Sequence, residues 1–234
     1  MIDWHSHVLP GIDDGSQDVA ESISLISAQA SQGITTVVAT PHFYANYESV
    51  DTFLSRRKAA LDLLRSELPD GSPEIRLGAE VRYYQGISRL EGLKELRIEG
   101  TKLLLLEMPR TAWTESMIRE LIELSGKSGI QLVLAHVERY IDLQKRTTVK
   151  RINDAGILKQ VNAEYFISFL SKRKAITALK EGDIQFVGSD CHNLTSRPPR
   201  IGQAYEMIRK KLGDDFITLV NEYGYSMLAT IKVN

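Results

Sequence analysis

Seven short segments of the chain are nearly continuous runs of apolar residues, rich in Val, Ile and Leu. They fall at residues 2–8, 34–40, 74–81, 101–107, 130–137, 158–163 and 184–189. Their length and continuous apolar character are typical of strands in a parallel sheet that is covered on both faces. Between them, apolar residues recur at helical spacing, as at Leu61, Leu64 and Leu68 and again at Leu121 and Leu124. The pattern therefore predicts strands that alternate with helices.

The alternation has no interruption that would mark a domain boundary, such as a Pro/Ser-rich linker or a low-complexity tract. Gly33, Gly129 and Gly156 each stand where a helix C-cap would lead into the next strand. We expect a single α/β domain over residues 1–234, built as a barrel or as an open doubly wound sheet, with residues 204–234 adding two helices. No Gly-x-Gly-x-x-Gly or Gly-Lys-Ser/Thr motif supports a dinucleotide-binding or P-loop protein.

Composition and charge exclude several classes of protein. Of the 234 residues, 43% are hydrophobic, and 29 basic residues oppose 30 acidic ones for a net charge of −1. This balance argues against a disordered chain and against general electrostatic binding of nucleic acid or anionic lipid. The basic runs at 56–58 and 172–174 are interpreted as solvated faces of helices, and Trp4 and Trp113 as core or pocket-wall residues.

The sequence also gives no sign of export or of thiol chemistry. The N-terminus lacks a basic region followed by an apolar stretch, and no apolar run reaches the roughly 18 residues of a membrane span. The single cysteine, Cys191, cannot form an internal disulfide and is interpreted as a packed structural thiol. We therefore expect a soluble, cytoplasmic protein without membrane insertion. Any metal must be held by nitrogen and oxygen atoms.

All five histidines fall at or just after the C-terminal ends of predicted strands, and four acidic residues join them. The set is His5, His7, Asp14, His42, Glu80, Glu107, His136, Asp190 and His192. In a parallel barrel these strand ends lie on one face, so residues spread over most of the chain are expected to converge there. An unpaired buried carboxylate is costly, and a metal ion is the partner that best explains acidic residues at the ends of apolar strands.

Residue spacing within the strands supports this interpretation. Residues two apart in an extended strand point the same way, which places His5 and His7 on one side. The same rule aligns Asp190 with His192. Imidazole and carboxylate groups without thiolate suit zinc, iron or manganese rather than calcium. Taken singly, each residue has an ordinary alternative, such as a strand-end cap or, for Asp13 or Asp14, a turn, but one metal cluster explains the whole set.

Six segments of the sequence, taken in order, resemble a known family. They are IDWHSHVLPGIDDGS, VVATPHF, LGAEVR, LLLEMP, LAHVERY and VGSDCHNLTSRPPR. Together they resemble the polymerase and histidinol phosphatase (PHP) superfamily, and most closely its bacterial metal-dependent protein-tyrosine phosphatases linked to capsule and exopolysaccharide synthesis. The resemblance covers about residues 1 to 200.

The resemblance implies a distorted (β/α)7 barrel of the PHP type that holds three divalent metal ions at its C-terminal face. Manganese is the expected metal, with iron, zinc or magnesium as alternatives. The implied ligands are His5, His7, Glu80 and Asp190 for the first ion, Glu80, Glu107 and His136 for the second, and Asp14, His42 and His192 for the third. Arg139 and Arg197 correspond to the family's substrate-binding arginines.

The implied activity is hydrolysis of phosphotyrosine on a protein by a metal-bridged hydroxide. The implied partner is a bacterial tyrosine kinase that regulates capsule or exopolysaccharide synthesis. Two alternatives stay open: hydrolysis of a small phosphomonoester such as histidinol phosphate or a sugar phosphate, and a metal-binding regulatory barrel without turnover. A cysteine-dependent route is disfavoured because Cys191 is not followed by a phosphate-binding loop.

Overall fold

The computed structural model describes residues 1–229, in which strands and helices alternate from the first residues onward. The strands are β1 (Ile2–Ser6), β2 (Thr36–Ala39), β3 (His42–Phe43), β4 (Glu74–Leu77), β5 (Glu80–Arg82), β6 (Leu103–Glu107), β7 (Gln131–Leu134), β8 (Leu158–Asn162) and β9 (Phe186–Gly188). Each of the seven predicted segments contains a strand, and the segment 74–81 divides into β4 and the start of β5. The prediction of strands that alternate with helices is confirmed.

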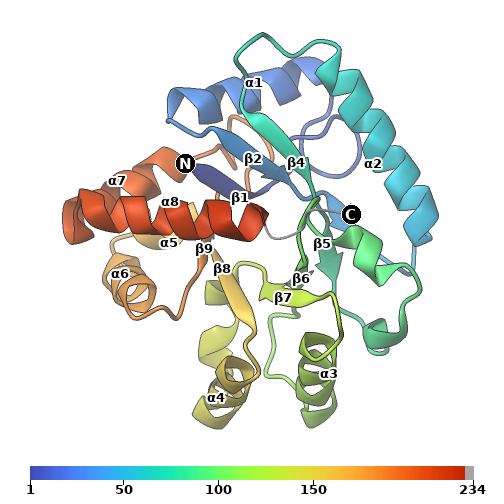
Figure 1. The fold of residues 1–234 in the computed structure, drawn as a ribbon, viewed down its shortest axis with the longest axis vertical. Helices are drawn as coiled ribbons and strands as arrows, with labels where there is room; N and C mark the ends of the chain where they lie inside the picture. The colour runs from blue at the N-terminus through green and yellow to red at the C-terminus, as the bar shows by residue number, and fades with distance from the viewer. Residues whose placement is uncertain (230–234) are drawn as a thin grey trace.

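The helices surround the strands (Figure 1). They are α1 (Val19–Ser31), α2 (Val50–Arg65), α3 (Glu115–Ser125), α4 (Arg146–Asp154), α5 (Ala163–Ile167), α6 (Lys172–Lys180), α7 (Ile201–Leu212) and α8 (Asp214–Leu228), with short 3-10 turns η1 (Ile87–Arg89), η2 (Leu93–Leu96), η3 (Val137–Arg139) and η4 (Ile141–Leu143). The sequence predicts two helices in the region 204–234, and the structure has α7, which begins earlier at Ile201, and α8 there; residues 230–234 lie outside the described part. Along residues 1–229, none of these helices combines the length and the apolar character needed to cross a bilayer.

All strand pairings are parallel, and they form a curled sheet rather than a flat one. Hydrogen bonds join β1–β2–β4 in one group and β3–β5–β6–β7–β8–β9 in another. The two groups are continuous in the chain, because β3 follows β2 and β5 follows β4 after two-residue breaks. A parallel bridge between Ser6 and Cys191 brings β1 beside the segment that follows β9. The C-terminal ends of the strands therefore lie on one face.

A buried apolar cluster fills the interior of the curled sheet below this face. It includes Trp4, Val38 and Leu105. The ring centroids of Trp4 and Phe186 are 4.2 Å apart. Helix α8 covers this cluster, since Leu228 packs into it. A second and larger apolar cluster lies between the outer surface of the strands and the surrounding helices. Trp4 is buried in the first cluster and Trp113 in the larger one, as expected from the sequence.

A β-bulge in β1 decides which side chains face the site. Asp3 is paired with Val37 and Ser6 with Ala39, so β1 has one residue more than β2 between these pairs. The extra residue lets two successive side chains face inward. Trp4 fills the apolar interior, and the next residue, His5, also points inward, toward β8 and β9.

Candidate metal centre

The structure brings all nine predicted residues together at the C-terminal ends of the strands. They come from β1 and the loop after it (His5, His7 and Asp14), from β3 (His42), β5 (Glu80) and β6 (Glu107), and from the segments after β7 (His136) and β9 (Asp190 and His192). Asp14 is the exposed member, with 64% of its side chain accessible, and the other eight are buried or half-buried. The predicted convergence of these side chains is therefore observed.

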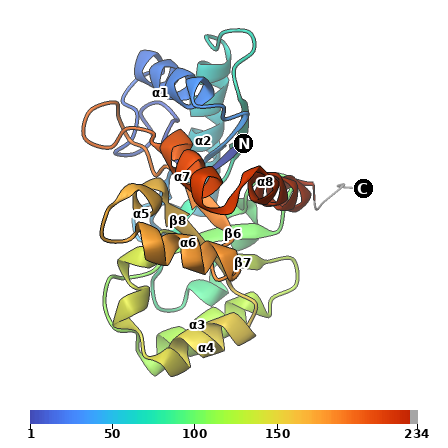
Figure 2. The same ribbon diagram turned by 90° about the vertical axis from the view of Figure 1, so that its left-hand side faces the viewer.

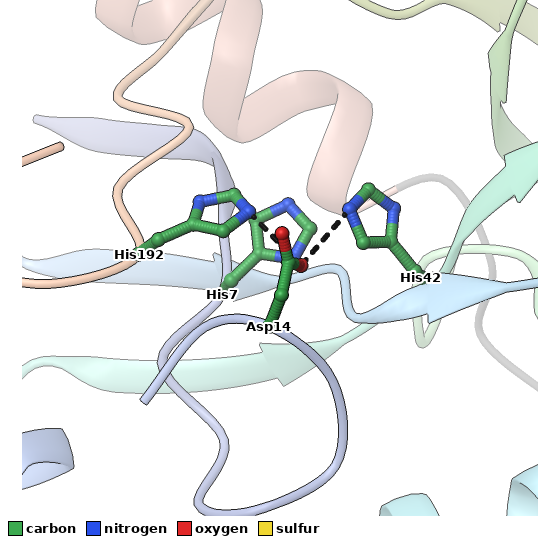
Figure 3. Close-up of side chains that lie close together, drawn as sticks. All are labelled: His7, Asp14, His42 and His192. Carbon is green, nitrogen blue, oxygen red and sulfur yellow. Dashed lines mark ion pairs between the residues drawn. The ribbon is translucent and has the colours of Figure 1, made fainter. Parts of the chain in front are cut away.

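The nine residues form overlapping groups whose nitrogen and oxygen atoms face one another. His5, His7, Glu80 and Asp190 form one group with all four potential ligand atoms within 4.8 Å of each other. His7, Asp14, His42 and His192 form another, and Figure 3 shows Asp14 between the rings of His42 and His192. The Oδ1 atom of Asp14 lies 3.3 Å from Nε2 of each of these two histidines.

A third group lies around Glu80 and Glu107. His42 joins them within the same 4.8 Å limit. The Nε2 atom of His136 lies 2.6 Å from Oε1 of Glu80 and 3.7 Å from Oε1 of Glu107. Glu80 is thus shared between groups, as expected of the residue that the sequence resemblance assigns to two metals.

The surroundings of the Glu80 carboxylate fit a bound cation. Its Oε2 atom lies 3.2 Å from Nε2 of His5, 3.4 Å from Nε2 of His7 and 2.9 Å from Nδ1 of His42. This oxygen is buried and nevertheless has no hydrogen-bond partner of acceptable geometry, and the same holds for Nε2 of His192. Buried polar atoms without partners are rare in proteins. Imidazole nitrogens and carboxylate oxygens are the donor set that a divalent transition metal takes.

Side chains behind the cluster fix the orientation of the imidazoles. The carboxylate of Asp13 accepts a hydrogen bond from Nδ1 of His7, which leaves Nε2 of His7 facing Glu80. The side-chain oxygen of Gln160 on β8 lies 3.1 Å from Nδ1 of His5 and accepts a hydrogen bond from the backbone N–H of His136. Such contacts to the second nitrogen of a histidine are common around metal ligands.

The electrostatics of the cluster favour an ionised Glu80 and a neutral His192. Burial alone would raise the pKa of Glu80, but the imidazoles of His5 and His136 hold it well below its usual range. Burial and the nearby His7 lower the pKa of His192 to about 4. His192 is consequently a neutral imidazole at neutral pH, which is the form that can ligate a metal.

Two of the nine residues have a left-handed backbone. In the described chain, the only residues other than glycine with positive φ are His136 (φ 32°) and Asp190 (φ 52°). Such conformations are strained for residues with a Cβ, and they concentrate at functional sites. For Asp190 this corrects the expectation of strand alternation, because β9 ends at Gly188 and the chain is not extended at Asp190.

Arginines surround a polar cavity of about 310 Å³ beside the cluster. Arg139 and Arg197 both pair with Asp190, with Nη2 of Arg197 2.9 Å from its Oδ1 atom. Arg82 pairs with Glu107 on another side of the cavity, and Arg110 also lines it. Glu80 and His136 contribute to the same wall, so the cavity joins the imidazole and carboxylate cluster to four guanidinium groups.

A comparison with protein-family models identifies the chain. The model described as "Capsular polysaccharide synthesis, CpsB/CapC" matches residues 1–224. The chain belongs to the CpsB/CapC family.

Named relatives and a solved structure agree with this membership. The chain is 30% identical over 226 residues to tyrosine-protein phosphatase CpsB of Streptococcus agalactiae serotype III (strain NEM316), covering 92% of each chain. It is 28% identical over 228 residues to tyrosine-protein phosphatase YwqE of Bacillus subtilis (strain 168), covering 95% of this chain and 89% of YwqE. A crystal structure from work on YwqE of Bacillus subtilis and CpsB of Streptococcus pneumoniae, described as metal-dependent tyrosine phosphatases, matches with a TM-score of 0.83 and 24% identity, covering 100% and 96% of the two chains.

Several residues around the centre of this CpsB/CapC protein were not singled out from the sequence. Gln160 and Asn162 are two positions apart in β8, and this spacing is a signal that their side chains share a face. Asn162 donates from Nδ2 to Asp190 at 2.8 Å. Arg82 and Arg110 gave no such signal, because single arginines near strand ends are usually solvated.

The single cysteine has the structural role that the sequence predicted. Cys191 is fully buried and lies 3.8 Å from Nε2 of Gln29. Burial raises the pKa of its thiol to about 12. The thiol is therefore protonated at neutral pH and cannot serve as a nucleophile there.

Proposed function

We propose that this CpsB/CapC protein is a metal-dependent protein-tyrosine phosphatase. The observation that carries the proposal is the cluster of five histidines and four carboxylates beside a cavity with four arginines. Relatives at about 30% identity over most of the chain are named tyrosine-protein phosphatases. A positively charged cavity next to a cation site suits a phosphate dianion.

The proposed centre holds three divalent ions, with manganese as the expected metal and iron, zinc or magnesium as alternatives. His5, His7, Glu80 and Asp190 would hold one ion, Glu80, Glu107 and His136 a second, and Asp14, His42 and His192 a third. The partnerless Oε2 of Glu80 and Nε2 of His192 support this assignment, because a bound cation would satisfy both atoms. We further infer a distorted (β/α)7 barrel of the PHP type over residues 1–234, in which β2 with β3 and β4 with β5 each count as one interrupted strand.

When bound, such ions stabilise charge on phosphoryl oxygens and supply a water of lowered pKa. The protein's own groups have separate tasks. Arg139 and Arg197 point planar guanidinium donors into the cavity and are placed to bind phosphate oxygens that the ions leave free. Their pairing with Asp190 holds them there before the substrate arrives. The tyrosinate leaving group has a pKa of about 10, so its departure needs less assistance from an acid than that of an alkoxide.

The proposed substrate is a tyrosine-phosphorylated protein. A bacterial tyrosine kinase that regulates capsule or exopolysaccharide synthesis is the expected partner, and the cytoplasm the expected location. The family description, which names capsular polysaccharide synthesis, supports the proposed link to capsule synthesis. Nucleic acid is not an expected partner, because the chain has a net charge of only −1.

Substrate comparison tests the proposal directly. The purified protein would be assayed with a phosphotyrosine peptide, the matching phosphoserine peptide and histidinol phosphate, each with added Mn²⁺ and with a chelator. We expect the highest kcat/KM for the phosphotyrosine peptide and no turnover with the chelator. Preference for phosphoserine or histidinol phosphate would reject the tyrosine assignment. Retained metal without turnover of any substrate would favour a regulatory barrel.

A further inference from the structure

The turn between α5 and α6 carries a patch of apolar and basic side chains that the catalytic cluster does not use. We define the docking patch as Phe169, Leu170, Lys172, Arg173 and Lys174. Phe169 is 84% exposed and Leu170 93% exposed. The two helices that flank the turn lie side by side (Figure 2). Large apolar side chains with this exposure contribute nothing to the core.

The exposure of these side chains comes from an ordered turn. The backbone N–H of Ser168 donates to the carbonyl of Glu164 at 2.9 Å, and that of Lys172 donates to the carbonyl of Ser168 at 3.0 Å. The hydroxyl of Ser171 donates to the carbonyl of Tyr165 at 2.8 Å. These bonds fix the backbone on both sides of the apolar pair. The fold therefore presents the pair to solvent.

The charges at the start of α6 are also unfavourable for the helix itself. Lys172, Arg173 and Lys174 occupy its first turn, which contains no acidic residue and has no side-chain cap. Cations at a helix N-terminus oppose the helix dipole. Lys174 pairs with Asp142, whereas Lys172 and Arg173 form no ion pair with any residue from 1 to 229. Lys172 instead stands over the ring of Phe169, 5.0 Å from its centroid. Residues that destabilise their own helix, as these basic residues do, are expected where the surface serves binding.

The docking patch adjoins a second cavity that shares two arginines with the cavity beside the metal cluster. Ser168 and Ser171, which enclose the apolar pair in the sequence, line a cavity of about 390 Å³ together with Tyr165. Arg139 and Arg197 line this cavity and also the cavity beside the metal cluster. A chain segment bound at these arginines can therefore extend through the second cavity as far as Ser168 and Ser171, the residues on either side of the apolar pair.

We propose that the docking patch binds an acidic segment of the protein substrate that flanks its phosphotyrosine. An apolar residue of this segment packs against Phe169 and Leu170, and carboxylates pair with Lys172 and Arg173. The proposal rests on the proposed function and deepens it, because it names the chemistry of the substrate around the reacting group. It commits to a protein segment, since the patch adjoins the cavity in which a phosphoryl group would bind.

Two double variants test the patch. Phe169→Ser with Leu170→Ser removes the apolar pair, and Lys172→Gln with Arg173→Gln removes the unpaired cations. The substrates are a phosphotyrosine peptide with acidic and apolar flanks, the same peptide with neutral polar flanks, and p-nitrophenyl phosphate, all with Mn²⁺. For each variant we expect KM for the acidic peptide to rise about tenfold, with kcat and the turnover of p-nitrophenyl phosphate unchanged. Leu219→Ser on α8, where the side chain is 58% exposed, is the matched control.

The outcomes separate failure of this inference from failure of the proposed function. If the wild type hydrolyses p-nitrophenyl phosphate but does not prefer the acidic peptide, the docking proposal is wrong and the proposed function stands. The same conclusion follows if the variants lose kcat/KM equally for all three substrates. If the wild type hydrolyses no aryl phosphate, the patch can still be tested by measuring the affinity for a non-hydrolysable phosphonate version of the acidic peptide by anisotropy. Equal affinity of the wild type and the variants would show that the patch does not bind the peptide. Binding to anionic phospholipid vesicles that is lost in the variants, with peptide KM unchanged, would identify a membrane surface instead.

Discussion

Asp13 accepts a hydrogen bond from Nδ1 of His7 at 2.7 Å and another from the backbone N–H of His42 at 2.9 Å. One buried carboxylate thus fixes the tautomer of one proposed ligand and the backbone position of a second. Although burial alone would raise the pKa of Asp13, its hydrogen bond and charge interaction with His7 lower it well below the usual value. Asp13 is therefore ionised at neutral pH, and we expect it to act as a positioning residue for the proposed centre.

Asp13→Ala is expected to reduce metal affinity by about 10- to 100-fold, because His7 loses the group that orients its ring. Isothermal titration of the metal-free protein with Mn²⁺ measures this change. Asp13→Asn keeps an acceptor oxygen and should lose less affinity, while Asp70→Ala in an exposed turn serves as the control. Equal affinity of Asp13→Ala and wild type would remove Asp13 from the centre.

Removal of metal should lower thermal stability as well as activity. Binding to the folded state alone stabilises it by about 2.7 kcal/mol at a free metal concentration of 100 Kd. For a chain of this length that corresponds to a rise in Tm of roughly 5 to 10 °C. Thermal unfolding with a chelator and with excess Mn²⁺ checks this difference, and added metal should restore turnover. Identical melting curves in the two conditions would argue against the proposed centre.

Arg139→Ala should impair turnover without removing metal. The guanidinium is not a proposed ligand, and Asp190 keeps its second partner, Arg197. Loss of a donor to a phosphoryl oxygen costs about 100- to 1000-fold in rate at comparable sites. The measurements are metal content by elemental analysis and kcat/KM for p-nitrophenyl phosphate. Arg151→Ala on the exposed side of α4 is the control, and an unchanged kcat/KM in Arg139→Ala would exclude this role.

Gly188→Ala should destabilise the fold at the site where β9 meets β1. A Cβ added at Gly188 would lie 2.5 Å from Cβ of His5 and 2.9 Å from its backbone nitrogen. The neighbouring backbone cannot move aside cheaply, and we expect a loss of about 3 kcal/mol in the free energy of unfolding. Urea denaturation measures it. Gly126→Ala is the matched control, because φ there is −80° and no neighbour of the new Cβ lies closer than 3.6 Å. A similar urea midpoint for Gly188→Ala and Gly126→Ala would contradict the close contact between Gly188 and His5.

Cys191 should resist alkylation in the native protein. It is fully buried, and a thiol whose pKa is raised to about 12 stays protonated as the pH rises through the range of ordinary cysteines. Iodoacetamide at pH 8 should leave both the thiol and the phosphatase activity intact, whereas the urea-unfolded chain should be labelled. Mass spectrometry follows the labelling. If activity fell in proportion to alkylation of Cys191 in the native protein, the thiol would have a role in catalysis.

The arrangement of strands and the meeting of the nine site residues could be predicted because both follow from a repeated pattern. Parallel strands carry their C-terminal ends to one face, so His5 and Asp190 can be placed together without knowledge of the contacts between them. The metal assignments themselves remain predictions. The short strand β3 was not predicted as a separate element, because two residues are too few to show a period.

Residues that act through tertiary contacts could not be predicted in the same way. Asp13 has the sequence signature of a turn, and its contact with His7 depends on the path of the loop. Arg82 and Arg110 reach the cavity from the ends of neighbouring strands, which sequence spacing does not reveal. The bulge in β1 shifts its register relative to β2, and the strand propensities of the residues do not predict this shift.

The bridge between Ser6 and Cys191 has a consequence for biosynthesis. Asp190 and His192 leave the ribosome roughly ten to forty seconds of translation after His5 and His7. Until then the nascent chain lacks the Asp190 carboxylate, whose Oδ1 atom lies 3.7 Å from Nε2 of His5 and 3.4 Å from Nε2 of His7. Under the proposed metal assignment, the first and third ion sites are completed only at this point, so we expect a chain that ends before the ninth strand to bind fewer ions than one that includes Asp190 and His192.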